Sequence, residues 1–201
     1  SWEISDDALA RVRAGAEARS EPAWVSPEGA AAWIEELDPT GRMTLSLTGG
    51  EPLMWPEFLL ALRPLIAKRR LHLETAGAHP SCMSRVLDVC DHVSADLKLP
   101  EDMGAPEQVG FSEPEPSPVS DEEWRSARRA FLETLRGRDA CLKLIVSGGR
   151  AAEDYAELLE DVRACAPALP LFLQPVTPVA GVSAPSDEML AQLVASSEAA
   201  G

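Results

Sequence analysis

The chain has 201 residues, 45% of them hydrophobic, and its formal net charge is −15. This length supports one sizeable core, so we expect a single domain over residues 1–201. An acidic surface repels phosphate backbones and anionic lipid, which argues against a nucleic-acid or membrane partner. No apolar run approaches the roughly 20 residues that span a bilayer, and no secretory segment opens the chain, so the expected location is cytoplasmic.

Helix and strand patterns alternate along the chain, separated by turn and capping residues. The weak amphipathicity of residues 6–18 allows a helix there. Helix starts are clearer at Ser26-Pro27-Glu28, at Trp55-Pro56 and at the capping residues Ser120 and Ser186. Further helices are expected over 81–88 and around 155–162. Strands are expected over 43–47, 71–75, 93–97, 141–147 and 171–174, and residues 101–119 form an acidic, Pro-rich loop.

This alternation of strands and helices predicts an α/β fold with a parallel sheet. No dinucleotide-type glycine fingerprint is present, which favours a barrel or a partial barrel over a nucleotide-binding open sheet. In such folds, the carboxyl ends of the strands meet at one rim and hold the ligand.

Polar residues collect where the predicted strands end. They are Thr48 to Glu51, Glu74 and Thr75, Ser94, Asp96 and Lys98, Ser147, and Gln174. Glycines 49 and 50 let a ligand approach the backbone, and the Glu51 carboxylate suits an amine. The plainer interpretation is a salt-bridged rim that holds the sheet ends together, and for Lys98 the two interpretations weigh equally.

The strand ends read LTGGEPL at 47–53, LETAG at 73–77, VSADLK at 93–98, KLIV at 143–146 and LQP at 173–175. In combination, they resemble the strand motifs of radical S-adenosylmethionine enzymes, and most closely those of the 7-carboxy-7-deazaguanine synthases. The resemblance spans about residues 43–178. It implies a partial (β/α)6 barrel of parallel strands, similar to part of a TIM barrel.

The resemblance also implies a chemistry. A [4Fe–4S] cluster would bind S-adenosylmethionine and cleave it to a radical that abstracts hydrogen from 6-carboxytetrahydropterin. The reaction would be that of a lyase in queuosine biosynthesis, in which the pterin ring contracts. A flavodoxin or similar reductant, Mg²⁺ and a homodimer are further expectations from the family.

Site residues follow from the matching motifs. Gly49, Gly50 and Glu51 would hold the methionine end of the cofactor, and Asp96, Leu97 and Lys98 its ribose side. The substrate would be bound by Thr48, Glu74, Thr75, Gln174 and Pro175.

The chain departs from the family in its cysteines. The family binds its cluster through a C-x3-C-x2-C loop after the first barrel strand. Here the cysteines are Cys82, Cys90, Cys141 and Cys165, none in a C-x-x-C pair. Either the chain is a fragment that begins after the first strand and cluster loop, or it is a degenerate homologue; the 201 residues alone should be inactive. We expect free thiols, with Cys90 and Cys141 in the core.

Three other functions remain open at this point. A glycyl-radical activating enzyme is compatible with Asp96-Leu97-Lys98. A cluster-less module that binds a nucleoside without catalysis would keep the same rim. A purely structural α/β domain would not need five polar strand ends in register.

Overall fold

The computed structural model describes residues 9–14, 17–66, 69–103, 114–179 and 181–198. Its centre is a five-stranded sheet, parallel throughout, with the strand order β3-β4-β5-β6-β7. The strands are β3 (Leu45–Leu47), β4 (Leu71–Thr75), β5 (His92–Leu97), β6 (Ala140–Val146) and β7 (Leu171–Pro175). The predicted α/β fold with a parallel sheet is therefore confirmed, while the six-unit partial barrel stays a prediction.

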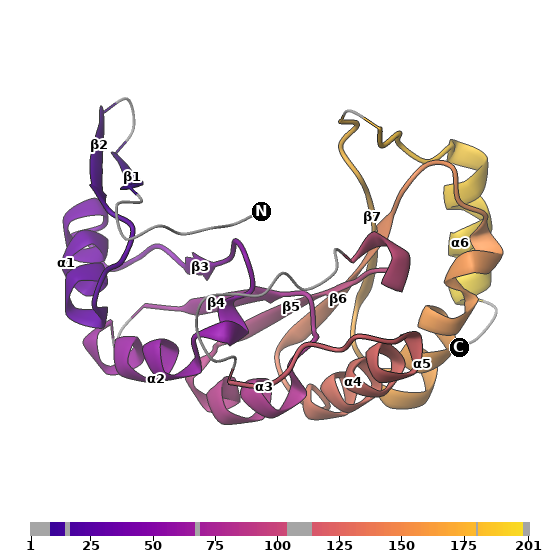
Figure 1. Ribbon diagram of the computed structural model, residues 1–201, viewed down its shortest axis with the longest axis horizontal. Coiled ribbons are helices and arrows are strands. Elements are labelled where there is room, and N and C mark those ends of the chain that lie inside the picture. The colour runs from indigo at the N-terminus through magenta and orange to yellow at the C-terminus, as the bar shows by residue number, and fades with distance from the viewer. Residues whose placement is uncertain (1–8, 15–16, 67–68, 104–113, 180, 199–201) are drawn as a thin grey trace.

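The helices lie on one side of this sheet. Figure 1 shows a crescent in which helices follow the outer edge and the strands lie on the inner side. The described helices are α1 (Pro27–Leu37), α2 (Pro56–Leu65), α3 (Pro80–Val86), α4 (Asp121–Thr134), α5 (Ala156–Cys165) and α6 (Asp187–Glu198). Short 3-10 helices are η1 (Pro52–Met54), η2 (Leu87–Val89), η3 (Pro100–Asp102) and η4 (Ala152–Tyr155). Among the described residues, no helix has the length and apolar character needed to cross a membrane.

Side-chain alternation explains how the sheet divides the molecule. Along β4, Leu71 and Leu73 are fully buried, whereas His72 and Glu74 point to the opposite side and are only half-buried. Leu73 packs with Phe131 and its neighbours on the helices into the main core, and Leu71 packs with Leu62 and Ile66 of the α2 region. Because successive strand residues face opposite sides, the inner side of the sheet receives the polar set.

The predicted helix starts are confirmed: α2 begins at Pro56 without a side-chain cap, and the three serines cap their helices through hydrogen bonds. Ser26 Oγ accepts from the Gly29 amide at 3.2 Å, Ser120 Oγ from Glu123 at 3.3 Å, and Ser186 Oγ from Met189 at 3.2 Å. Of the predicted loop 101–119, residues 104–113 lie outside the described residues.

The expected helix over 6–18 is wrong in its described part. Residues 9–14 form β1 (Leu9–Ala14), which pairs antiparallel with β2 (Glu17–Pro22). The apolar and charged residues of this stretch alternate locally, and Val12 is buried while its neighbours Arg11 and Arg13 are exposed. An alternation with a period of two fits a strand better than a helix.

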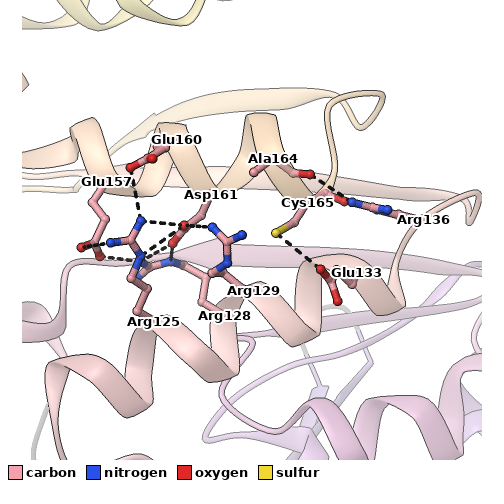
Figure 2. A network of polar contacts seen from close by, with 10 residues as sticks. All are labelled: Arg125, Arg128, Arg129, Glu133, Arg136, Glu157, Glu160, Asp161, Ala164 and Cys165. Atoms are coloured by element: carbon pink, nitrogen blue, oxygen red, sulfur yellow. Dashed lines mark hydrogen bonds and ion pairs between the residues drawn. The ribbon is translucent and has the colours of Figure 1, made fainter.

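A cluster of charges joins α4 to α5 (Figure 2). Asp161 on α5 is fully buried and accepts hydrogen bonds from Arg128 Nε at 2.9 Å and from Arg129 Nη1 at 2.8 Å. Arg125 adds a longer contact of 3.4 Å and also reaches Glu157 and Glu160 on the outside. The cluster fixes the two helices against each other at the outer edge.

Candidate functional site

The inner side of the sheet carries polar side chains from all five of its strands. We call this surface the inner face; it consists of Ser46, His72, Glu74, His92, Ser94, Asp96, Cys141, Lys143, Phe172 and Gln174. The register places these residues side by side, with Asp96 opposite Lys143 and Glu74 opposite Ser94. The parallel sheet thus brings residues that are up to 128 positions apart in sequence onto one surface.

Lys143 is the centre of the charged part of the inner face. Its Nζ lies 3.0 Å from Glu74 Oε2 and 2.9 Å from Asp96 Oδ1. Burial lowers the pKa of Lys143, but the hydrogen bonds to Asp96 and Glu74 outweigh it, so its net pKa is raised. The hydrogen bond from Lys143 lowers the pKa of Glu74, with Ser46 contributing a second one. Both groups are therefore charged near neutral pH.

Asp96 also pairs with Lys98, at 3.2 Å between Oδ2 and Nζ. Two carboxylates and two ammonium groups thus balance in this part of the site. A small cavity of about 20 Å³ lies beside them, between the ends of β4 and β5 and helix α4. It has room for roughly one water molecule. This cavity is too small for a nucleoside.

The Gly49–Glu51 turn follows β3 at the same end of the sheet. Both glycines have positive φ, 88° for Gly49 and 57° for Gly50, and no atom lies within 4 Å of an added Cβ at either position. These backbone angles favour glycine. The turn therefore presents bare backbone to open space, and the ligand contact expected there stays a prediction.

Glu51 anchors this turn to the end of β4. Its Oε1 accepts hydrogen bonds from the Leu53 amide at 3.0 Å and from Thr75 Oγ1 at 2.8 Å, and its Oε2 accepts from the Ala76 amide at 2.9 Å. An ionised carboxylate offers about four acceptor positions. The described residues use three of them, so within this part of the chain one position on Oε2 is left for a donor such as an amine.

The other predicted site residues lie in different environments. Thr75 is buried and also accepts from the Gly77 amide at 3.1 Å, which makes it a support for Glu51. Leu97 is buried in the main core, so only its backbone faces the rim. Gln174 is exposed on the inner face of β7, opposite Ile145, and Pro175 pairs with Val146. Thr48 is exposed directly after β3. Their ligand contacts stay predictions.

Lys143 is a residue that sequence reasoning did not select for the site. The signal was present, because a lysine stands inside the apolar strand sequence Cys-Leu-Lys-Leu-Ile. A charged residue in such a strand is rarely buried without a partner. The two partners, Glu74 and Asp96, were selected.

The prediction for the thiols is partly right. All four cysteines are free. Cys90 packs against the main core, as expected. Cys141 is not a core residue: its Sγ lies on the inner face, 3.2 Å from Ser94 Oγ and 3.6 Å from His92 Nε2. The apolar composition of β6 concealed this, because the second residue of a strand can face either side.

Comparison with known proteins supports the resemblance. Over 148 residues, the chain is 31% identical to the 7-carboxy-7-deazaguanine synthase of Methanothermobacter thermautotrophicus, covering 72% of this chain and 60% of the relative. It is 29% identical over 140 residues to the synthase of the same name from Geobacter sulfurreducens, covering 67% and 48%. The chain is a relative of radical S-adenosylmethionine enzymes. No family model matches it.

The fold agrees with this relationship. A radical SAM methyltransferase from Sphaerobacter thermophilus superposes with a TM-score of 0.59 at 17% identity, covering 91% of this chain and 56% of that one. At this identity, the likeness concerns the fold alone. The chain spans 60% and 48% of the length of its two curated radical SAM relatives.

The described residues do not fit a metal cluster. Among them, no group of three or more His, Cys, Asp or Glu side chains is placed to hold a metal ion. Cys82 and Cys165 are buried on α3 and α5, away from the inner face. Burial raises the pKa of Cys82 to about 11 and also raises that of Cys165, which disfavours the thiolate needed for ligation.

Proposed function

We propose that the Gly49–Glu51 turn and the part of the inner face around Asp96 and Lys143 bind S-adenosylmethionine, and that the chain works in a radical enzyme of the 7-carboxy-7-deazaguanine synthase type. Such a lyase would contract the ring of 6-carboxytetrahydropterin. The observation that carries the proposal is the free acceptor position on Glu51, set beside two exposed glycines at the end of the parallel sheet.

The residues present suit the methionine end of this cofactor. The free position on Glu51 Oε2 would accept from the α-amine, and the exposed backbone of Gly49 and Gly50 would contact the rest of the amino-acid group. Asp96 would accept from a ribose hydroxyl, since carboxylates near a sugar commonly do so. Lys143, 2.9 Å from Asp96 Oδ1, would hold the carboxylate in place for that contact.

The substrate side of the proposal concerns the pterin. Thr48, Glu74, Gln174 and Pro175 would bind it from β3, β4 and β7, with Thr75 in support through Glu51. The iron–sulfur cluster, the flavodoxin-like reductant, Mg²⁺ and a homodimer belong to the proposal through the resemblance. No step is assigned to them, because the described residues include no ligand set for the cluster.

Calorimetry with this protein tests the cofactor part. S-adenosylmethionine should bind, and Glu51→Gln should weaken it by about 10- to 100-fold, because a hydrogen bond to a charged group contributes roughly 1.5–3 kcal/mol. Glu57→Gln is the matched control: Glu57 lies on the surface nearby and pairs with Arg85, so affinity should not change.

A second ligand separates loss of the amine contact from local misfolding. 5′-Methylthioadenosine has the nucleoside but no amino-acid group, so Glu51→Gln should leave its affinity unchanged. Equal loss for both ligands would contradict the role of Glu51, and no binding of either to the wild type would overturn the proposal. If S-adenosylmethionine binds more tightly when 6-carboxytetrahydropterin is present, the result supports an enzyme of the 7-carboxy-7-deazaguanine synthase type. If neither ligand changes the affinity of the other, the result refutes that type.

A further inference from the structure

A group of residues at the amino-terminal end of the inner face plays no part in the proposed function. Cys141 is the second residue of β6, and its Sγ contacts His92 Nε2 and Ser94 Oγ on β5. Lys143 stands two residues further along the same side, a separation of about 7 Å in a strand. The thiol is therefore beside the candidate cofactor site and outside it.

His92 is oriented by a carboxylate. Its Nδ1 lies 2.7 Å from Asp139 Oδ1. The hydrogen bond from His92 is the main cause that lowers the pKa of Asp139, so this carboxylate is ionised and only accepts. Nδ1 must then carry the ring proton, and the lone pair of Nε2 faces the Cys141 thiol at 3.6 Å. Carboxylate, imidazole and thiol stand in the order used to activate cysteine nucleophiles.

A second chain of hydrogen bonds ends at the same thiol. Ser46 Oγ donates to the Glu74 carboxylate at 2.9 Å, so it accepts from His72 Nδ1 at 3.1 Å. His72 Nε2 then accepts from Ser94 Oγ at 2.8 Å. The Ser94 proton is thus engaged, and its oxygen meets Cys141 Sγ as an acceptor. Two acceptors, Ser94 and His92, converge on a single thiol proton, and only His92 is basic enough to take it.

We propose that Cys141 is a nucleophilic thiol, activated by His92 and Asp139, that forms covalent adducts with small soft electrophiles reaching the inner face. In the reaction, the thiol proton passes to His92 Nε2, the thiolate forms an S–C bond, and the leaving group departs with the electrons of its bond to carbon. Asp139 stabilises the imidazolium. With iodoacetamide, the products are the S-carbamidomethyl side chain and iodide.

The charges around Cys141 and His92 decide whether the thiolate–imidazolium pair can form. The charged and titratable groups near Cys141 are His92 and Asp139, then Arg70, which pairs with Asp139, then His72 through Ser94, and Lys143 and Glu74 along the face. Arg70 and Lys143 favour a thiolate and Asp139 favours the imidazolium. Burial lowers the pKa of His72, so that ring adds no positive charge near neutral pH.

Residue-resolved alkylation tests this proposal. The protein is treated with iodoacetamide from pH 5.5 to 9.5, and the labelling rate of each cysteine is followed by peptide mass spectrometry. We expect Cys141 to show a half-maximal rate below pH 7.5, against about 8.5 for the same cysteine in the urea-unfolded chain. Cys82, Cys90 and Cys165 serve as internal references, since burial raises the pKa of each thiol.

Variants identify the activating groups. His92→Gln should move the midpoint of Cys141 to 8.5 or above, and Asp139→Asn should move it part of the way. Asp88→Asn is the matched control, because Asp88 is 86% exposed, pairs with Arg138 and touches no member of the group. A wild-type midpoint at or above 8.5 overturns the proposal without any variant. An unchanged midpoint in a folded His92→Gln protein overturns the role of His92.

Discussion

Lys143 joins carboxylates that come from two different strands, and its removal should be felt in stability. Lys143→Met leaves Glu74 without its ammonium partner and Asp96 with Lys98 as its remaining partner among the described residues, and each carboxylate is at most one-third exposed. We expect a loss of about 2 kcal/mol in the free energy of unfolding, measured by urea denaturation at pH 7. Lys98→Met is the matched control: among the described residues Lys98 forms an ion pair with Asp96 alone, so its loss should cost about 0.5 kcal/mol.

The pH dependence of this loss follows from the two pKa shifts. The pKa of Glu74 is lowered from 4.5, so its stabilising contribution is complete above that value and disappears as pH falls through the folded-state pKa. The pKa of Lys143 is raised from 10.5, so its contribution is complete below that value. The difference between wild type and Lys143→Met should be greatest between pH 4.5 and 10.5 and should shrink at pH 4. A difference that grows on acidification would contradict this assignment.

At the scale of elements, α4 and α5 depend on one buried carboxylate (Figure 2). Burial alone would raise the pKa of Asp161, but the hydrogen bonds from Arg128 and Arg129 outweigh it and the net pKa is lowered. Asp161→Ala should cost about 3–5 kcal/mol, because it leaves the nearly buried Arg128 without its main partner.

The control for this change lies one residue away. Glu160 contacts Arg125 but is 63% exposed, so Glu160→Gln should alter the free energy of unfolding by less than about 0.5 kcal/mol. Urea denaturation of both variants at the same pH gives the comparison. If the two substitutions lower the free energy of unfolding equally, the buried carboxylate of Asp161 does not stabilise the protein more than an exposed one.

Sequence patterns predicted elements well where a local rule decides the structure. Ser26 and Ser120 cap their helices as expected, and the alternation in β4 places Glu74 on the polar side. The sequence patterns failed where contacts between distant parts of the chain decide which way a side chain faces. The sequence around Cys141 does not indicate that its thiol contacts His92, which lies 49 residues earlier on another strand. Nor does the sequence around Lys143 indicate that it bridges Glu74 and Asp96. For residues 9–14, a weak helical spacing of apolar residues favoured a helix, whereas the short alternation of apolar and charged residues indicated the strand that the structure has.

At the scale of the molecule, the buried apolar side chains of the described residues form two clusters, and the partly buried Leu47 and Phe58 pack against both. The larger one joins β4, β5 and β6 to α3, α4 and α5. The smaller one consists of Leu62, Ile66 and Leu71, with side chains of α1 packed against it, and α1 itself contributes no buried residue. In the antiparallel pair β1 and β2, Val12 is buried and Glu21 is half-buried, and the other side chains whose burial is described are exposed. The end of the crescent that carries β1, β2 and α1 therefore has little apolar burial to hold it (Figure 1).

Native-state hydrogen exchange should show this division. Amides of β5 should exchange only through global unfolding, while those of β1 and α1 should exchange at least 100-fold faster through local opening. Leu144→Ala separates the two processes. Leu144 is fully buried in β6, so its truncation should lower global stability by about 2–5 kcal/mol and speed exchange in β5 accordingly. Exchange in β1 should keep its rate, because local opening does not break the larger cluster. If β1 and β5 accelerate together, the molecule unfolds as one unit and the division is wrong.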